Sequence, residues 1–229
     1  MRIEEMLTKK RSRLLLDVSL WSGNLVNLQE SIDATCAWAD WYHLDVADAH
    51  YVPSLLFFPD IIRAIRRYTE VPLHTHLMMT DPLDHLESFV EAGSDLISLH
   101  VDQGEENLLQ AAAYLKGQGV RMGLVLCVED EITSILPYLR EISLILVMGT
   151  KIGIKGASLE ESTPERIGGI KKLLVDNGVS QQIILSADGG IREHTVPLLR
   201  QAGVDMITPG SLVFASTDLD STVAELHSL

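Results

Sequence analysis

The chain has few basic residues and only two cysteines for its length of 229 residues. It carries 18 Lys and Arg against 32 Asp and Glu, which gives a formal net charge of −14. A chain this acidic repels phosphate backbones and anionic lipid headgroups, which argues against charge-driven binding of nucleic acid or membranes. Cys36 and Cys127 are too far apart in sequence to form a metal or redox motif, so we expect buried free thiols in a reducing compartment.

The sequence also lacks any long apolar run. No stretch approaches the roughly 20 apolar residues of a transmembrane helix, and residues 1–13 mix charges without the apolar core of a secretory signal. The hydrophobic fraction of 46% is sufficient for one large core. We therefore expect residues 1–229 to form one domain of a cytoplasmic protein that binds neither membranes nor nucleic acid.

Short runs rich in Leu, Ile and Val alternate with helix-like patterns along the whole chain, and they lack the polar alternation of half-exposed strands. The runs predict strands at Leu14–Ser19, Trp41–Val46, Pro72–Leu77, Leu96–Val101, Arg121–Leu126, Leu144–Gly149, Ile183–Ala187 and Asp205–Thr208. The intervals predict helices at Leu25–Trp38, Pro59–Tyr68, Leu83–Ala92, Asn107–Lys116, Ile132–Leu139, Pro164–Asp176, Glu193–Gln201 and Asp218–His227. Eight strand–helix units predict an α/β fold, a closed (β/α)8 TIM barrel. A doubly wound open sheet is the alternative, but this chain has no Gly-rich dinucleotide-binding loop after the first predicted strand.

One segment gathers two histidines and two aspartates within eight residues: His43, Asp45, Asp48 and His50. His43 and Asp45 share one face of their predicted strand, because alternate side chains point the same way. An imidazole beside a carboxylate suits a divalent metal, and a metal-bound carboxylate can also move protons. The segment therefore predicts half of a metal site.

The other half is expected from two later strands, because barrel closure brings all carboxyl strand ends to one mouth. Taken singly, His76 is a common structural residue and Asp188 begins an ordinary Asp-Gly-Gly turn. Together with His43 and Asp45 they provide two imidazoles and two carboxylates, which suit Zn²⁺, Mn²⁺, Fe²⁺ or Co²⁺ rather than Ca²⁺. Asp45 and Asp188 come from well-separated strands, so they could exchange protons with opposite faces of one substrate carbon.

The longest interval between predicted strands follows the sixth strand and contains Gly149, Gly153 and Gly156 together with Lys151 and Lys155. A long glycine-containing loop at this end of a barrel is either a lid that cradles phosphate or an ordinary surface loop. Composition alone supports both interpretations equally.

These motifs together resemble the ribulose-phosphate 3-epimerase family over nearly the whole chain. The matching segments are Val18–Ser22, His43–Pro53, Pro72–Met78, Asp188–Ile191 and Pro209–Phe214. The resemblance implies an isomerase of carbohydrate metabolism, in the pentose phosphate pathway, that acts on D-ribulose 5-phosphate. It further implies one catalytic divalent metal, no organic cofactor, and a homo-oligomer that is a dimer or a hexamer.

The resemblance also implies roles for individual residues. His43, Asp45, His76 and Asp188 would be the metal ligands, and Asp45 and Asp188 would be the acid/base pair that inverts C3 through an enediolate. The implied substrate contacts are Ser19 at the hydroxyls, Met78 and Met148 at the reacting face, Gly189, Gly190, Gly210 and Ser211 at the phosphate, and Gly153 and Gly156 over it.

The chain departs from the family pattern in two informative places. The sixth-loop pattern Asn-Pro-Gly-Phe-Gly-Gly-Gln is replaced by Lys-Ile-Gly-Ile-Lys-Gly-Ala at residues 151–157, and His74 stands where the third strand usually has an acidic residue. This favours retained proton transfer and leaves the sugar open between D-ribulose 5-phosphate and a close relative, such as a hexulose or tetrulose phosphate. One alternative is a decarboxylase or aldolase, but Asp45-Val-Ala-Asp48 lacks the lysine typical of such decarboxylases. Another is a non-catalytic paralogue that binds metal and sugar phosphate.

Overall fold

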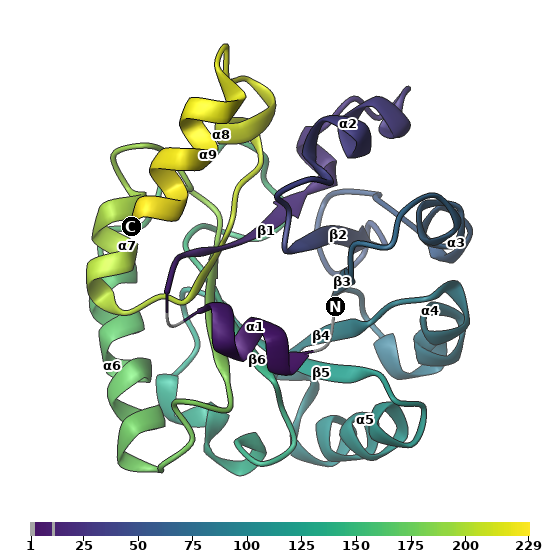
Figure 1. Cartoon of the computed structure of the whole chain (residues 1–229). Coiled ribbons are helices and arrows are strands. Elements are labelled where there is room, and N and C mark those ends of the chain that lie inside the picture. Colours follow the sequence, from purple (N-terminus) through teal and green to yellow (C-terminus); the bar gives the residue numbers. More distant parts are fainter. Residues whose placement is uncertain (1–2, 11) are drawn as a thin grey trace.

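The computed structural model describes residues 3–10 and 12–229, and its centre is a closed barrel of eight parallel strands in chain order (Figure 1). The strands are β1 (Leu15–Ser19), β2 (Trp41–Ala47), β3 (Leu73–Met78), β4 (Leu96–His100), β5 (Arg121–Leu126), β6 (Leu144–Met148), β7 (Ile184–Asp188) and β8 (Met206–Thr208). Each strand end lies within one residue of its predicted position. The predicted TIM barrel is therefore confirmed.

The helices surround the barrel and cover the outer face of the strands (Figure 1). They are α2 (Leu28–Thr35), α3 (Pro59–Tyr68), α4 (Leu86–Ala92), α5 (Glu105–Gly117), α6 (Thr163–Asp176), α7 (Val196–Ala202), α8 (Ser211–Phe214) and α9 (Leu219–Ser228). Four 3₁₀ helices add η1 (Leu20–Ser22), η2 (Pro82–His85), η3 (Val101–Gln103) and η4 (Ile132–Tyr138). The described part of the chain contains no helix with the length and hydropathy needed to cross a membrane.

Two predicted helices differ in kind from the observed ones. The segment predicted as a helix at Ile132–Leu139 is the 3₁₀ helix η4, because Pro137 lies inside it and lacks the N–H that an α-helix requires. The segment predicted at Leu83–Ala92 divides into η2, which has Pro82 at its first position, and α4. Both differences follow from proline, which favours short 3₁₀ turns over a continuous helix.

The interior of the barrel is apolar at one end and polar at the other. Side chains alternate along each strand, so Leu15, Trp41, Leu96, Leu144 and Ile184 pack together where the strands begin. One or two inward positions further along, the strands carry buried polar residues, namely Asp17, His43, Asp45, His74, His76, Ser98, His100 and Ser186. The polar groups therefore lie inside the barrel towards its carboxyl end.

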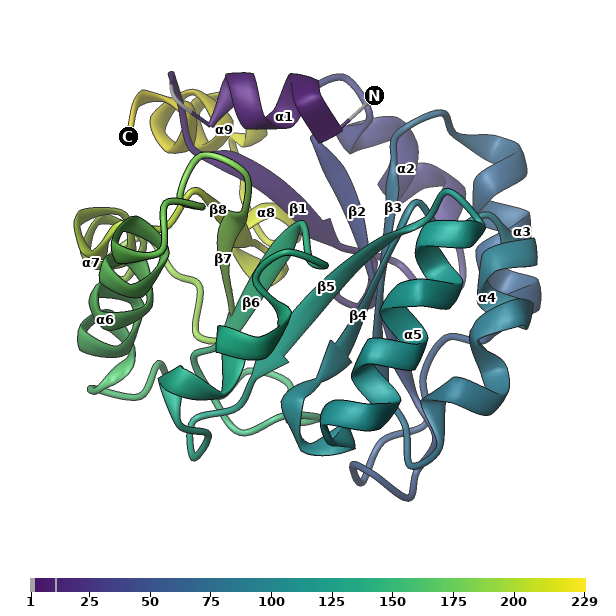
Figure 2. The same ribbon diagram turned by 90° about the horizontal axis from the view of Figure 1, so that it is seen from below.

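A helix that the sequence did not predict closes the apolar end. Helix α1 (Ile3–Lys9) lies across the end where the strands begin (Figure 2). Its Met6 is fully buried, packs into the apolar interior cluster and accepts a hydrogen bond from the Trp41 indole.

The expectation that both cysteines are buried is half wrong, since Cys127 is buried but Cys36, at the end of α2, is exposed.

We expect Met6→Ala to lower the free energy of unfolding by about 2–5 kcal/mol, because truncation leaves a cavity under the barrel. Urea denaturation of the purified protein measures this change. Glu5→Ala is the matched control, since Glu5 is exposed on the same helix and should change stability by less than about 0.5 kcal/mol. Small and equal effects of both substitutions would show that α1 does not stabilise the barrel.

Candidate metal centre and active-site pocket

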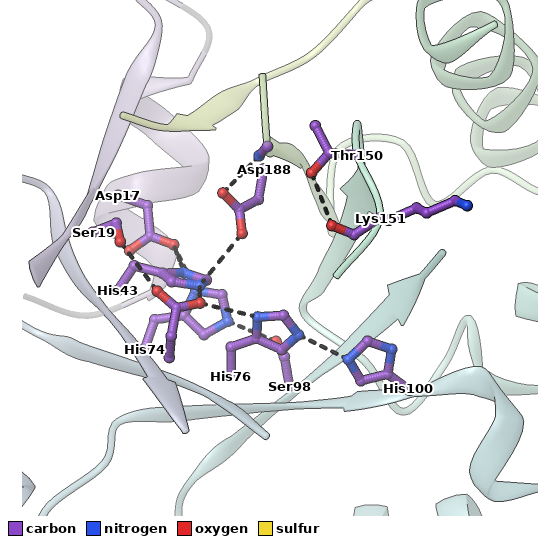
Figure 3. Close-up of polar contacts among 12 residues, drawn as sticks. Asp17, Ser19, His43, His74, His76, Ser98, His100, Thr150, Lys151 and Asp188 are labelled. Atoms are coloured by element: carbon purple, nitrogen blue, oxygen red, sulfur yellow. Dashed lines mark hydrogen bonds and ion pairs between the residues drawn. The ribbon is translucent and has the colours of Figure 1, made fainter. Parts of the chain in front are cut away.

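The strand register gathers the four predicted ligands at the polar end of the barrel. Asp45 on β2 lies directly opposite His76 on β3, and His43 precedes Asp45 on the same inward face. Asp188 ends β7 on the other side of the barrel. The four residues offer ligand atoms that all lie within 4.8 Å of one another. Figure 3 shows His43, His76 and Asp188 of this set pointing toward one another.

The distances within this cluster suit a shared divalent cation. His43 Nε2 lies 3.2 Å from Asp45 Oδ1 and 3.8 Å from Asp188 Oδ2, and His76 Nδ1 lies 3.5 Å from Asp45 Oδ1. His76 Nδ1 is buried and has no hydrogen-bond partner among the described residues, which is unfavourable for a polar atom. A cation among the four side chains would satisfy this nitrogen. Two imidazoles with two carboxylates are a donor set that Zn²⁺, Fe²⁺, Mn²⁺ and Co²⁺ accept.

The two carboxylates of the cluster have different electrostatic environments. Burial alone would raise the pKa of Asp45, but the attraction of His43, its hydrogen bond to the carboxylate and the proximity of His76 hold that pKa well below its usual range. Burial raises the pKa of Asp188 to about 7, and the negative charge of Asp45 adds to this against the opposing effects of His43 and the Gly189 N–H. One carboxylate thus stays ionised, while the other can hold or release a proton near neutral pH.

Behind the cluster, a buried aspartate binds two histidines, and the sequence patterns did not single it out. Asp17 Oδ2 accepts hydrogen bonds from Nδ1 of His43 at 2.9 Å and Nδ1 of His74 at 2.6 Å. Burial opposes ionisation of this carboxyl, but the two histidines lower its pKa to about 2. Asp17 is one acidic residue in an apolar strand, without a partner nearby in sequence, so no spacing marks it.

His76, the other histidine of the cluster, contacts a further histidine, His100. His76 Nε2 lies 2.9 Å from His100 Nε2 at the end of β4, and the two rings are stacked. Burial lowers the pKa of His76 to about 4 and that of His100 well below its usual value. Two neutral rings can share one proton between their Nε2 atoms, and a proton on His76 Nε2 leaves its Nδ1 lone pair free for the cluster.

A cavity of about 280 Å³ opens above the cluster at the carboxyl ends of the strands. All nine residues predicted to contact substrate line it: Ser19, Met78, Met148, Gly153, Gly156, Gly189, Gly190, Gly210 and Ser211. Ser19 also donates a hydrogen bond to Asp45 Oδ2 at 3.1 Å. Trp21, Arg192 and Thr208 line the cavity as well and were not predicted.

Two consecutive glycines, Gly189 and Gly190, form part of one wall of the cavity. Gly189 and Gly190 have φ values of +86° and +70°, which glycine adopts freely. A Cβ at Gly189 would collide with Thr150, and one at Gly190 would collide with the backbone of Leu159. These two positions therefore require glycine, which lets the backbone lie close against Thr150 and Leu159, and the Gly189 N–H donates a hydrogen bond to Asp188 Oδ1 at 2.7 Å.

The loop after β6 crosses the mouth of this cavity. Lys155 Nζ donates a hydrogen bond to the Trp21 carbonyl at 2.9 Å and lies 5.7 Å from the centre of the Trp21 ring. Ser54 donates to the Gly153 carbonyl at 2.8 Å, which ties the same loop to the segment after β2. These contacts favour the lid interpretation over that of an ordinary surface loop.

Asp48 and His50, from the histidine-rich segment, lie outside the cluster. The Asp48 carboxylate accepts hydrogen bonds from the backbone N–H groups of His50, Tyr51 and Thr80, each at 2.8 Å. Asp48 thus shapes the loop after β2, and His50 is exposed.

Comparison with known proteins identifies relatives over most of the chain. The model of the Ribulose-phosphate 3 epimerase family matches residues 15–214. A ribulose-phosphate 3-epimerase of Chlamydia pneumoniae is 31% identical over 212 residues, which cover 92% of each chain. That of Bacillus subtilis is 30% identical over 210 residues, 91% of this chain and 96% of the relative.

Solved structures with a similar fold are more distant in sequence. A 3-keto-L-gulonate-6-phosphate decarboxylase from Vibrio cholerae superposes with a TM-score of 0.72 at 12% identity, over 93% of this chain and 95% of the other. A 3-hexulose-6-phosphate synthase from Salmonella typhimurium gives 0.67 at 16% identity, over 93% and 96%. At these identities the likeness is one of fold alone.

We expect His76→Ala to weaken Zn²⁺ binding by more than the roughly 10–100-fold that loss of an outer hydrogen-bond partner costs, since it removes a ligand atom. Competition with a chromogenic chelator measures the affinity. His50→Ala is the matched control and should leave it unchanged. If both substitutions had the same effect, or His76→Ala had none, the four-residue cluster would not be the metal site.

Proposed function

The chain belongs to the ribulose-phosphate 3-epimerase family, and on that premise we propose that it is a metal-dependent ketose-phosphate 3-epimerase. The proposed reaction interconverts D-ribulose 5-phosphate and D-xylulose 5-phosphate, or the C3 epimers of a closely related ketose phosphate. The observation that carries this proposal is the pair of carboxylates, Asp45 on β2 and Asp188 on β7, that lie together with His43 and His76 at the floor of a cavity with a glycine-lined wall.

His43, Asp45, His76 and Asp188 would hold one divalent metal, and no organic cofactor is required. A bound divalent metal would act as a Lewis acid that stabilises negative charge developing on the substrate's oxygens. That stabilisation is needed because a proton next to a ketone is too weakly acidic for a carboxylate alone at neutral pH. The zinc, iron, manganese and cobalt ions all suit the donor set.

Asp45 and Asp188 would carry the protons. One carboxylate removes the C3 proton from one face of the sugar, and the electron pair of that C–H bond moves into the enediolate. The other carboxyl delivers its proton to C3 from the opposite face, which inverts the configuration. In the metal-free chain burial raises the pKa of Asp188 while Asp45 stays ionised, so the two carboxylates are not equivalent.

The remaining cavity residues would position the sugar. Ser19 would contact the substrate's hydroxyls, and Met78 and Met148, both almost fully buried, would keep water from the reacting face. The phosphate would bind main-chain N–H groups and a hydroxyl of Gly189, Gly190, Gly210 and Ser211, and Gly153 and Gly156 would cover it from the loop after β6.

Schiff-base aldolase chemistry has no support among these residues. It requires a buried strand lysine, and none of the described strands β1–β8 carries one. The lysines of the cavity, Lys151 and Lys155, lie on the exposed loop after β6.

We expect the metal-loaded protein, assayed in D₂O on a panel of ketose phosphates, to epimerise D-ribulose 5-phosphate with deuterium incorporated at C3. Asp188→Asn should lower the rate by at least ~10²–10⁴-fold, the range for loss of a general acid or base. Asp130→Asn is the matched control, because that carboxyl also has a raised pKa from burial but lies outside the cavity. It should retain the activity of the parent protein.

Three outcomes of the panel assay would contradict the proposal. Full activity of Asp188→Asn would disprove the two-base mechanism. Metal binding without turnover of any ketose phosphate would establish a non-catalytic paralogue. Carbon–carbon bond cleavage would move the protein to the aldolase or decarboxylase class.

A further inference from the structure

The buried carboxylate of Asp17 touches the candidate metal centre without belonging to it. Asp17 lies on β1 one inward position before Ser19, and Ser19 pairs directly with His43 on β2. The side chain is 0% exposed and takes no part in lining the cavity. No substrate can reach it, so any contribution to function must act through the residues it contacts.

The contact with His43 determines which nitrogen that histidine offers to a metal. Asp17 Oδ2 lies 2.9 Å from His43 Nδ1, and an ionised carboxylate can only accept, so the proton resides on Nδ1. His43 Nε2 is then the nitrogen that faces Asp45 and Asp188, at 3.2 and 3.8 Å from their oxygens; a metal bound there would replace the Nε2 proton that faces Asp45 and take up the lone pair. The same bond fixes the plane of the ring, as carboxylate–histidine pairs do at metal sites in general.

A second histidine holds the carboxylate in place. His74 Nδ1 lies 2.6 Å from the same oxygen, Asp17 Oδ2, and His74 Nε2 lies 2.7 Å from Ser98 Oγ (Figure 3). The His74 ring packs edge-on against His43, with ring centres 4.7 Å apart. Both nitrogens of His74 are therefore engaged, and the chain of contacts runs from Ser98 through His74 and Asp17 to His43.

We propose that Asp17 is a positioning residue of the metal centre, which holds His43 in the tautomer and ring orientation required to bind a divalent metal through Nε2. His74 and Ser98 support it from behind. The carboxylate that serves the centre thus comes from β1, while β3 carries His74 where the family resemblance places an acidic residue. The inference rests on the proposed function only in treating His43 as a metal ligand, and its test measures metal binding rather than turnover.

A second metal held by Asp17, His43 and His74 is a competing interpretation, because their ligand atoms also lie within 4.8 Å of one another. A separation of 2.6 Å between His74 Nδ1 and Asp17 Oδ2 is that of a charge-assisted hydrogen bond. A metal there would require both Nδ1 atoms to lose their protons, and it would have to enter a site whose three side chains are 0% exposed. The geometry favours the hydrogen-bonded arrangement.

Asp17→Asn tests the proposal with little change of shape. We expect Zn²⁺ affinity, measured by chelator competition, to fall about 10–100-fold, the usual effect of losing an outer partner of a metal-bound histidine. The matched control is Asp205→Asn, which neutralises another buried carboxylate, bonded to Lys10, Lys171 and the Leu185 N–H. It should lower thermal stability but leave Zn²⁺ affinity within about twofold, because Asp205 precedes β8 at the opposite end of the barrel from the cluster. Equal affinities of Asp17→Asn and the parent protein would overturn the proposal.

A measurement on the unaltered protein decides the question even if Asp17→Asn fails to fold. In the zinc-loaded chain labelled with ¹⁵N-histidine, long-range ¹H–¹⁵N spectra should place the His43 proton on Nδ1 and the zinc on Nε2. Zinc on Nδ1, or two zinc ions per chain, would contradict the proposal. Neither readout involves turnover, so a catalytically silent protein could still pass this test. Failure of the Asp17 proposal is therefore distinguishable from failure of the proposed function in the panel assay.

Discussion

The polar end of the barrel is organised around the two ring nitrogens of His43, which face two different groups of carboxylates. Nδ1 is bonded to Asp17 on β1, and Nε2 faces Asp45 on β2 and Asp188 on β7. A fully buried imidazole with charged neighbours on both sides is stable only if every partner is held in place, since an unpaired buried charge is strongly destabilising. The closed barrel supplies that rigidity, because each partner sits on a strand whose register is fixed by both neighbouring strands.

The same arrangement separates the two carboxylates that could move protons. Asp45 is surrounded by hydrogen-bond donors, whereas burial dominates the environment of Asp188, so their pKa values move in opposite directions. Environments that move the pKa values of two identical side chains in opposite directions are the usual way in which a protein obtains one base and one acid from them. Gly189 and Gly190 form part of the cavity wall beside these carboxylates, and the loop after β6 crosses above them.

Much of this fold could be predicted from the chain, because parallel strands buried on both faces are continuous runs of Leu, Ile and Val. The cluster of His43, Asp45, His76 and Asp188 was also predictable, since period-two alternation and barrel closure together determine which strand-end residues meet. Helix α1 was missed because its charged residues conceal a single buried side chain, Met6. Asp17 was missed because it lies in the middle of β1 and not at the carboxyl end, where the strand-end residues meet. The 3₁₀ helix η4 was taken for an α-helix, although Pro137 was visible in the sequence.

The central claim is that one divalent metal occupies the space among His43, Asp45, His76 and Asp188. A crystal structure of the zinc-loaded protein, with the anomalous signal recorded at the zinc edge, tests it most directly. The account predicts one strong peak per chain, about 2.0–2.2 Å from the histidine nitrogens and carboxylate oxygens of these four residues. A peak between Asp17 and His74, or no peak in the barrel interior, would contradict it.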